Sequence, residues 1–556
     1  MRVEAFTSFL LLAVVHHVAC QPSISMPTVT IKNGTLVGTR NPTYNQEFFL
    51  GVPYASPPVG NLRLRKPVPP ENWNGSRVSN TCSSWCLGVD IGLPGFSQNV
   101  TGPMSEDCLY LNIIRPANVP LTAKLPVMTW IHGGGFLSGS ANDLRYNGSF
   151  LVNNSVKMGT PVIFVSFNYR LGAFGMLSGS EAENAGATNI FLHDQRQALA
   201  WIQENIAEFG GDPSRVTVFG ESAGAISVGL QLIAYGGRDE GLFSAAIMES
   251  GNPYTSLLST TEADKEASFQ KLLNTTNCTE ALDSLACLRS APALSLLEAA
   301  STPISVDGEI LPESAASAMA NGHFLKVPAM IGTNRNEGTN LKASVSPLPV
   351  NNYTDFQRVL DTEFEYSNLT ERDRESLWVL YRNAANGSGD AGLGTVLSNY
   401  AGNYYGAATL MLGDATFVSG RRGTNQRYAA QGVPTYSYFF DAQTANLDAQ
   451  EYGVAHFQEI PFVFGNWQGV GWEVNPVPAG EKETSYYKLA ETMSRMWISF
   501  AVFHSPNYHK LPYIDVAWPT YNDENPTNMA FTLSGIHEQA DTWRQRENEV
   551  LLGLQP

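Results

Sequence analysis

The chain has 556 residues, of which 43% are hydrophobic and 11% aromatic, so it can bury a large core. Its formal net charge is -17 at pH 7, and an acidic surface repels phosphate backbones, which disfavours a nucleic-acid partner. The sequence has no Gly-rich phosphate loop, HExxH motif or paired CxxC motifs, so we expect no cofactor and no metal site.

The N-terminus has the pattern of an export signal. A basic start at Met1-Arg2 precedes an apolar run over residues 6–15, and Val18-Ala19-Cys20 offers small residues before Gln21. The run of about ten apolar residues is too short for a membrane span, which needs roughly 20. We therefore predict a signal peptide over residues 1–20 and a secreted, extracellular product without a stable membrane anchor.

No linker, charge block or repeat interrupts the remainder, so residues 21–556 are expected to form a single domain.

Short, almost wholly apolar segments alternate with segments of helix length. Strands buried on both faces are predicted at residues 127–131, 162–167, 216–219, 245–248, 329–331 and 435–440. Helices are predicted at residues 194–208, 225–233 and 484–503. Residues 260–325 and 350–430 are helical and loop-rich, and we expect them above the carboxyl edge of the sheet. The alternation predicts an α/β fold with a large, mainly parallel sheet covered by helices on both faces.

Three consecutive glycines follow the first of these strands, in His132-Gly133-Gly134-Gly135-Phe136. Glycines in a row cost conformational entropy, so they need a reason. Their bare backbone N–H groups can approach a ligand, and in this kind of sheet such a loop supplies donors to an oxyanion. A flexible loop without a ligand is the alternative.

A GxSxG motif, Gly220-Glu221-Ser222-Ala223-Gly224, follows the strand at residues 216–219. The motif alone is short enough to arise by chance, but here it also precedes an apolar helix. That strand–turn–helix setting is typical of a nucleophile elbow, in which the serine is strained and the flanking glycines avoid collisions. Ser222 is therefore the predicted nucleophile, and the N–H group of Ala223 is a predicted oxyanion donor.

A serine nucleophile needs a base, and the base needs an orienting carboxylate. In this fold the chain order is serine, acid, histidine. Glu337 lies just past the strand at residues 329–331, at the edge where such active sites occur. His456 lies in a loop after the run at residues 435–440, but spacing alone leaves His323 and His504 as alternative bases.

Five cysteines remain if Cys20 leaves with the signal, and an odd number predicts bridges plus one leftover thiol. Cys278 and Cys287 are nine residues apart, close enough to staple a surface loop. Cys108 must pair with either Cys86 or Cys82, and spacing does not decide between them.

Asn-X-Ser/Thr sequons are dense, which together with a signal peptide predicts a glycoprotein. Two sequons are set aside, Asn153 because it falls in a helical segment and Asn277 because it adjoins a candidate disulfide. Glycosylation is predicted at Asn33, Asn74, Asn99, Asn147, Asn274, Asn352, Asn368 and Asn386.

Several longer motifs carry a family resemblance along nearly the whole mature chain. They are Phe-Leu-Gly-Val-Pro-Tyr-Ala at residues 49–55 with Pro-Pro-Val-Gly at 57–60, Ser-Glu-Asp-Cys-Leu-Tyr-Leu-Asn at 105–112, and Phe-Gly-Gly-Asp-Pro at 209–213. With these motifs the chain resembles the type-B carboxylesterase/lipase family, which includes cholinesterases and the fungal Geotrichum and Candida lipases. The resemblance implies the α/β-hydrolase fold and hydrolysis of carboxylic esters through an acyl-enzyme, with no cofactor.

The family's functional residues can be carried over motif by motif. Its triad acid falls on Glu337, although Asn336 stands where the family usually has an aspartate. Its base falls on His456, which precedes a Phe-Val-Phe-Gly stretch at residues 462–465. The resemblance also places oxyanion donors on Gly134, Gly135 and Ala223, and implies a Cys86–Cys108 bridge with Cys82 as the free thiol.

Relatives place a lid between the first two bridged cysteines, and here that segment has 21 residues. We expect a lid this short to favour soluble short- to medium-chain or aryl esters. Two alternatives keep the same triad: a lipase or sterol esterase acting on long-chain lipid esters, and an acyltransferase in a biosynthetic pathway. A non-catalytic binding protein is disfavoured because every catalytic residue is present. The apolar residues that could still line a lipid site are Leu87, Val89, Ile91, Leu93 and Phe96.

Overall fold

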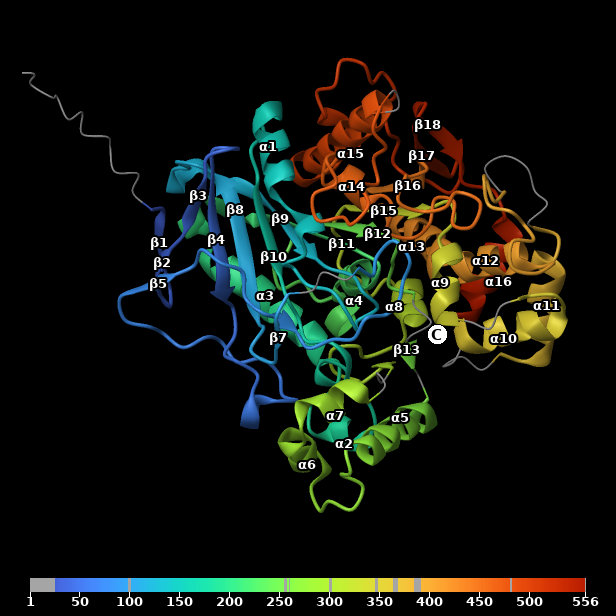
Figure 1. Cartoon of the computed structure of the whole chain (residues 1–556), viewed down its shortest axis with the longest axis horizontal. Helices are drawn as coiled ribbons and strands as arrows, with labels where there is room; N and C mark the ends of the chain where they lie inside the picture. Colours follow the sequence, from blue (N-terminus) through green and yellow to red (C-terminus); the bar gives the residue numbers. More distant parts are fainter. Residues whose placement is uncertain are drawn as a thin grey trace, which may run out of the picture.

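The computed structural model describes residues 26–98, 102–254, 258–259, 261–299, 303–345, 349–363, 369–384, 392–480 and 483–555. The predicted signal peptide and the sequons at Asn99, Asn368 and Asn386 lie outside the described residues. An 11-stranded sheet runs through the molecule in the order β18-β17-β16-β15-β12-β11-β9-β10-β8-β4-β3 (Figure 1).

The centre of this sheet is parallel, as the sequence predicts, and its two edges are antiparallel. The parallel strands are β10 (Ile163–Phe167), β9 (Leu125–Ile131), β11 (Gly211–Glu221), β12 (Ala245–Glu249), β15 (Ala329–Asn334), β16 (Thr435–Asp441) and β17 (Thr527–Thr532). The antiparallel strands are β8 (Tyr110–Pro116), β4 (Gln46–Pro53) and β3 (Thr39–Asn41) at one edge and β18 (Gly535–Ala540) at the other. All six predicted strands are confirmed; β10 begins one residue later than predicted, and the other five extend beyond the predicted bounds.

Helices cover both faces, which explains why the central strands are apolar throughout. In β9, Val127 and Ile131 belong to a core with α3 (Ile190–Asn205) and α4 (Ala223–Gly237). The intervening residues Met128 and Trp130 belong to a second core with α1 (Ser149–Met158), α14 (Ile460–Val463) and α15 (Glu483–Phe503). Since successive side chains of a strand point to opposite faces, both sets are buried.

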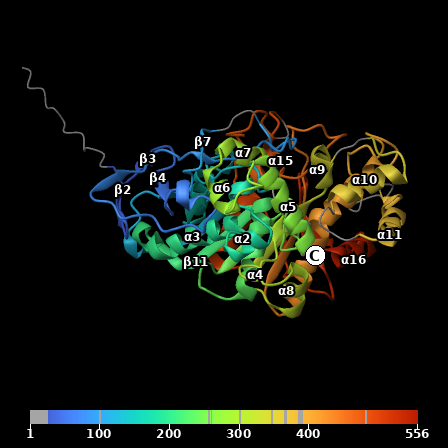
Figure 2. The ribbon, with the colours of Figure 1, turned by 90° about the horizontal axis from the view of Figure 1, so that it is seen from below.

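Within the described residues, the segments 260–325 and 350–430 consist mainly of helices and loops, as the sequence predicts. The first contains α5 (Glu262–Thr275), α6 (Ser284–Ser290), α7 (Ala293–Glu298) and α8 (Ala315–Asn321). The second contains α10 (Tyr353–Glu363), α11 (Glu371–Tyr381), α12 (Tyr405–Gly413) and α13 (Ser419–Ala430). In both views α10 and α11 lie at the opposite end of the molecule from β3 and β4 (Figures 1 and 2).

The second segment also meets the edge of the sheet that carries the predicted acid. Its helix α12 packs against α9 (Gly338–Val345), which begins directly after Glu337. The backbones of α9 and α12 approach each other closely at Gly338, where an added Cβ would lie 2.1 Å from the carbonyl oxygen of Thr409. In the part of the chain that the structure describes, no helix combines the length and apolarity of a membrane span.

Candidate active site

Ser222 occupies a sharp turn between β11 and α4. Its backbone has φ 57° and ψ −126°, and its N–H donates to the carbonyl of Glu249 on the neighbouring strand β12, at 2.9 Å. A Cβ at Gly220 or at Gly224 would lie 2.6 or 2.0 Å from the carbonyl oxygen of Ile131, so the turn needs both glycines. The serine itself is partly exposed, as a nucleophile must be.

The glycine loop after β9 lies directly against this turn. A Cβ at Gly133 would lie only 3.0 Å from the Cβ of Ser222. Gly134 and Gly135 have φ of 105° and 61°, a backbone that side chains rarely permit. Ala223 is the first residue of α4, where backbone N–H groups have no partner within the helix. The loop and the helix N-terminus therefore gather backbone donors around the serine.

The predicted acid and base are in direct contact. Nδ1 of His456 lies 2.7 Å from Oε2 of Glu337, and both side chains are buried. The other carboxylate oxygen, Oε1, accepts hydrogen bonds from the N–H of Asn334 and the hydroxyl of Ser250, each at 2.6 Å. The ring of Phe417 stacks on His456 with centroids 4.5 Å apart and planes at 12°. These contacts fix the imidazole with Nδ1 toward the acid.

The second ring nitrogen, Nε2, faces the serine turn. It lies 3.1 Å from Oε1 of Glu221, the residue that precedes Ser222. Among the described residues, Ser222 Oγ makes no hydrogen bond to His456, and catalytic hydrogen bonds often tighten only when substrate is bound. The structure thus joins Glu337 to His456 and places Ser222 beside the carboxylate that Nε2 contacts.

The two alternative bases have other surroundings. His323 is mostly exposed and pairs with Glu313 near α8, at 2.5 Å. His504 follows α15, where burial and the positive charge of Arg215 lower its pKa. The geometry therefore favours His456.

Three further glutamates are buried around the acid–base pair, and the sequence analysis missed all of them. Oε2 of Glu459 accepts from the amide of Asn334 at 2.6 Å, and Oε1 of Glu249 accepts from the indole of Trp497 at 2.7 Å. Burial, with the negative charge of Glu337 nearby, raises the pKa of Glu459 to about 7. Burial and the neighbouring carboxyls raise the pKa of Glu221 and of Glu249 well above the ordinary value.

These raised pKa values favour the neutral form of the three carboxyls, which limits the negative charge around the imidazole. A signal for two of them exists in the sequence, since Glu221 is part of the GxSxG motif and Glu459 follows His456 by three residues. Within the described ranges, no group of three or more histidine, cysteine, aspartate or glutamate side chains is arranged to hold a metal ion.

Both disulfides implied by the sequence are formed in the structure. Cys86 pairs with Cys108, with Cα atoms 5.0 Å apart, and Cys278 pairs with Cys287, with Cα atoms 5.7 Å apart. Cys82 is unpaired and exposed.

The segment after Cys86 covers the glycine loop. Cδ1 of Ile91 would lie 4.0 Å from a Cβ at Gly135, and Cζ of Phe96 would lie 3.2 Å from one at Gly134. Leu93 and Phe96 are buried. The segment expected to be a lid therefore packs against the glycine loop.

Several contacts hold this lid in place. Nη1 of Arg145 donates to the carbonyl of Phe96 at 2.7 Å, and Arg145 is itself paired with Asp143 at 2.6 Å. The ring of Phe96 packs edge-to-face on Phe457, the residue after His456, with centroids 5.0 Å apart. The amide of Asn340 donates to the carbonyl of Pro94 at 3.0 Å. The lid is thus tied to elements on both sides of the site.

The described sequons differ in exposure. Asn74, Asn274 and Asn352 are exposed, and Asn147 is partly buried. Asn33 is only 8% exposed, and its amide donates to the carbonyl of Pro70 and to Oδ1 of Asn72. A glycan on Asn33 would have to displace both bonds.

A model of the carboxylesterase family matches residues 25–548. The chain belongs to the carboxylesterase family. This confirms the resemblance inferred from the motifs, and the family's α/β-hydrolase fold agrees with the large mixed sheet and its helical covering.

The relatives of this carboxylesterase include both a fungal lipase and a cholinesterase. Lipase 1 of Geotrichum candidum is 36% identical over 411 residues, covering 66% of this chain and 68% of its own. Acetylcholinesterase of Electrophorus electricus is 32% identical over 568 residues, covering 92% and 85%. In solved structures, EstA of Aspergillus niger superposes with a TM-score of 0.81 at 27% identity, covering 95% of this chain and 98% of that one. The protein is an ester hydrolase of the serine type.

Proposed function

We propose that this carboxylesterase hydrolyses its substrates with Ser222 as nucleophile, His456 as general base and Glu337 as the orienting acid. The observation that supports this most is the 2.7 Å contact between His456 Nδ1 and Glu337, with Nε2 facing the turn that carries Ser222. Such an arrangement gives the three roles that acyl transfer by a serine requires.

The reaction follows from these positions. Ser222 Oγ attacks the ester carbonyl carbon while His456 Nε2 takes its proton, and Glu337 stabilises the imidazolium. The oxyanion of the tetrahedral intermediate accepts hydrogen bonds from the N–H groups of Gly134, Gly135 and Ala223. The C–O bond to the alcohol breaks as His456 returns the proton to it, leaving an acyl-serine. A water molecule, deprotonated by His456, then releases the acid and restores the serine.

The preferred substrates are soluble short- to medium-chain or aryl esters. The support is the anchored lid, because Arg145 and Asn340 hold it by hydrogen bonds to Phe96 and Pro94. A lid fixed in this way would not swing open at an oil surface. Ser222 is partly exposed with the lid in place, so dissolved substrate can reach it directly.

Long-chain lipid esters are the second candidate, and one observation favours them. A cavity of about 320 Å³ lies between the base of the lid and Leu137, which follows the glycine loop. Its walls are mostly apolar and include Leu87, Val89 and Phe174, together with the charged Glu298. The lipase among the relatives is consistent with this alternative.

We also propose that the protein is exported, with residues 1–20 removed and residues 21–556 folding as one domain. The two disulfides support an oxidising compartment. Glycosylation at the exposed Asn74, Asn274 and Asn352 would accompany export. N-terminal sequencing of protein from the culture medium tests this, and a start other than Gln21 would contradict the cleavage site.

The catalytic assignment is tested with a fluorophosphonate label and the variant Ser222→Ala. We expect the label on Ser222 alone, and a fall in kcat of roughly 10⁴- to 10⁶-fold in the variant without loss of its thermal transition. Label on another residue, or a variant that keeps a tenth of the wild-type turnover, would refute the assignment. p-Nitrophenyl esters of increasing chain length, with a triglyceride emulsion and a cholesteryl ester, then separate the substrate classes.

A further inference from the structure

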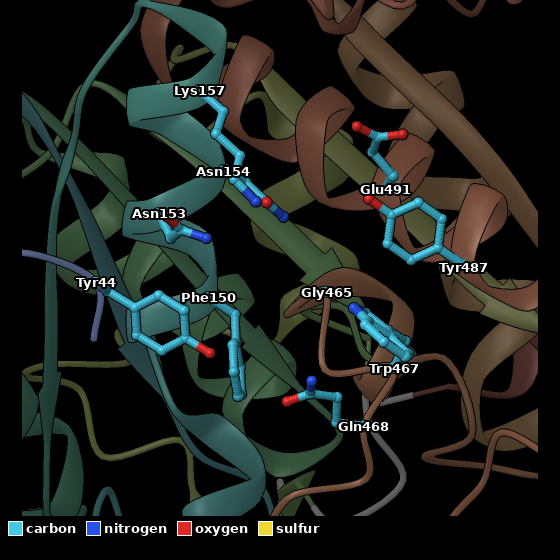
Figure 3. A pocket seen from close by; sticks show the side chains of 10 residues that line it. All are labelled: Tyr44, Phe150, Asn153, Asn154, Lys157, Gly465, Trp467, Gln468, Tyr487 and Glu491. Carbon is cyan, nitrogen blue, oxygen red and sulfur yellow. The ribbon is translucent and has the colours of Figure 1, made fainter.

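A second cavity, of about 190 Å³, lies apart from the catalytic residues, between α1 and α15 (Figure 3). The turn between β3 and β4 and the segment after α14 complete its walls. None of the triad or oxyanion residues lines it. The chemistry of ester hydrolysis therefore does not account for its composition.

Two aromatic pairs face each other across this cavity. On the α1 side, Tyr44 and Phe150 pack edge-to-face with ring centroids 6.0 Å apart. On the α15 side, Trp467 and Tyr487 do the same at 5.4 Å (Figure 3). Tyr487 is 40% exposed and Trp467 is partly exposed, so both rings offer surface to a ligand. Exposed aromatic rings of this kind bind flat, apolar faces.

Uncharged polar side chains lie between the two aromatic pairs. The amides of Asn153 and Gln468 project into the space from different elements, and each amide can both donate and accept hydrogen bonds (Figure 3). Lys157 and Glu491 also line the cavity. Glu491 is also bound to the guanidinium of Arg495 and the hydroxyl of Tyr513, at 2.6 and 2.8 Å.

These features narrow the class of ligand. A small ion would leave the aromatic faces uncovered, and a purely apolar chain would leave the amides without partners in the cavity. A ligand with apolar C–H faces and hydroxyl groups at its edges satisfies both the rings and the amides. We propose that this cavity is a saccharide-binding site, in which a sugar ring stacks on Trp467 and Tyr487 and its hydroxyls bond to the neighbouring amides.

The saccharide can be either a glycan attached to this chain or a free oligosaccharide. Asn153 begins the sequon Asn153-Asn154-Ser155, which was set aside above because it lies in a helical segment, here α1. Its amide nevertheless points into the cavity, so an N-linked glycan attached before α1 folds would lie between the aromatic rings (Figure 3). This source depends on the export proposed above. The other source is a free oligosaccharide, such as one on a polysaccharide surface.

Glycopeptide mass spectrometry of secreted protein separates the sources. If Asn153 is glycosylated, we expect an amidase acting on native protein to release its glycan at least about tenfold more slowly than the glycan of the exposed Asn74. Trp467→Ala should remove that protection. Release of both glycans at the same rate would overturn the proposal for this source.

If Asn153 is unmodified, titration calorimetry with chitotriose, cellotriose and maltotriose is the test. We expect at least one trisaccharide to bind with Kd below about 10 mM, and affinity to fall about tenfold or more in Trp467→Ala and Tyr487→Ala. Tyr487→Phe keeps the ring and should keep the affinity. Absence of binding, or binding that both alanine variants retain, would overturn the proposal. Esterase activity should be unchanged in all three variants, so this outcome is independent of the catalytic assignment.

Discussion

Asn336 and Val454 are joined by two hydrogen bonds that fix the distance between the acid and the base. The N–H of Asn336 donates to the carbonyl of Val454, and the N–H of Val454 donates to Oδ1 of Asn336, each at 2.9 Å. Asn336 directly precedes Glu337, and Val454 lies two residues before His456. The asparagine that departs from the family's usual aspartate therefore keeps the acceptor that holds the histidine loop.

We predict that Asn336→Ala lowers kcat by roughly 10- to 100-fold with little change in KM, because the His456 loop loses its anchor and small misplacements of a catalytic group are costly. Asn336→Asp keeps the Oδ1 acceptor and should lie closer to wild type than the alanine variant. Steady-state kinetics on p-nitrophenyl butyrate measure both. An alanine variant with unchanged kcat would show that the two bonds do not position the base.

Glu337→Gln should reduce kcat by roughly 10³- to 10⁴-fold and affect KM much less. Asn334 N–H and the Ser250 hydroxyl both donate to Oε1, so a glutamine would turn its carbonyl oxygen toward them. Its NH₂ group would then face His456 Nδ1 and force the imidazole proton onto Nε2, where it blocks proton transfer from Ser222. A variant with raised KM and normal kcat would instead assign Glu337 to substrate binding.

The raised pKa of Glu459 means that the free energy of unfolding should depend on pH. Its pKa is raised to about 7 in the folded protein by burial and the nearby Glu337 charge, against about 4.3 for an unfolded glutamate. The unfolded chain therefore ionises first as pH rises from about 4.3 to 7, and folding loses up to roughly 4 kcal/mol over that window. Below it both states hold the proton, and nothing is lost.

Glu459→Gln removes this ionisation and keeps an oxygen for the Asn334 amide. We expect the decrease in Tm between pH 4.5 and 7.5 to be smaller in this variant than in wild type. The exposed Glu71→Gln is the matched control and should follow wild type. Parallel Tm curves for all three proteins would mean that Glu459 does not contribute to the pH dependence.

The parts of the fold that sequence alone predicted are those with a simple pattern. β9 and β11 are apolar throughout because helices cover both faces, and that pattern is visible without a structure. β17 is equally buried but contains Asn528, whose Oδ1 accepts from Arg421 and from the hydroxyl of Ser437. A polar residue satisfied by partners far along the chain hides a strand from pattern analysis.

Contacts between residues far apart in the chain also limit how much of the active site the sequence predicts. The turn at Ser222 and the glycine loop are local, so strand, turn and helix follow one another in the sequence. The choice of His456 over His323 and His504 depends on contact with Glu337 across more than a hundred residues, and spacing cannot supply it. The buried glutamates were missed because a charged residue type is normally exposed, and only the structure shows Glu249 beneath the serine turn.

The mobility of the lid separates an esterase from a lipase. An interfacial enzyme needs a lid that moves, because an oil surface favours the open, apolar state only if that state is accessible. Here Phe96 is fixed by Arg145 through its carbonyl and by Phe457 through its ring. We expect the rate on p-nitrophenyl butyrate and tributyrin to saturate normally and to show no jump at the solubility limit. Phe96→Ala releases the ring contact and should raise the rate on an emulsion relative to the soluble ester, whereas Met104→Ala, at an exposed lid position that does not line the apolar cavity, should not. A sharp rise for wild type on entering the emulsion would place long-chain lipids first, because it would mean that the lid opens despite these contacts.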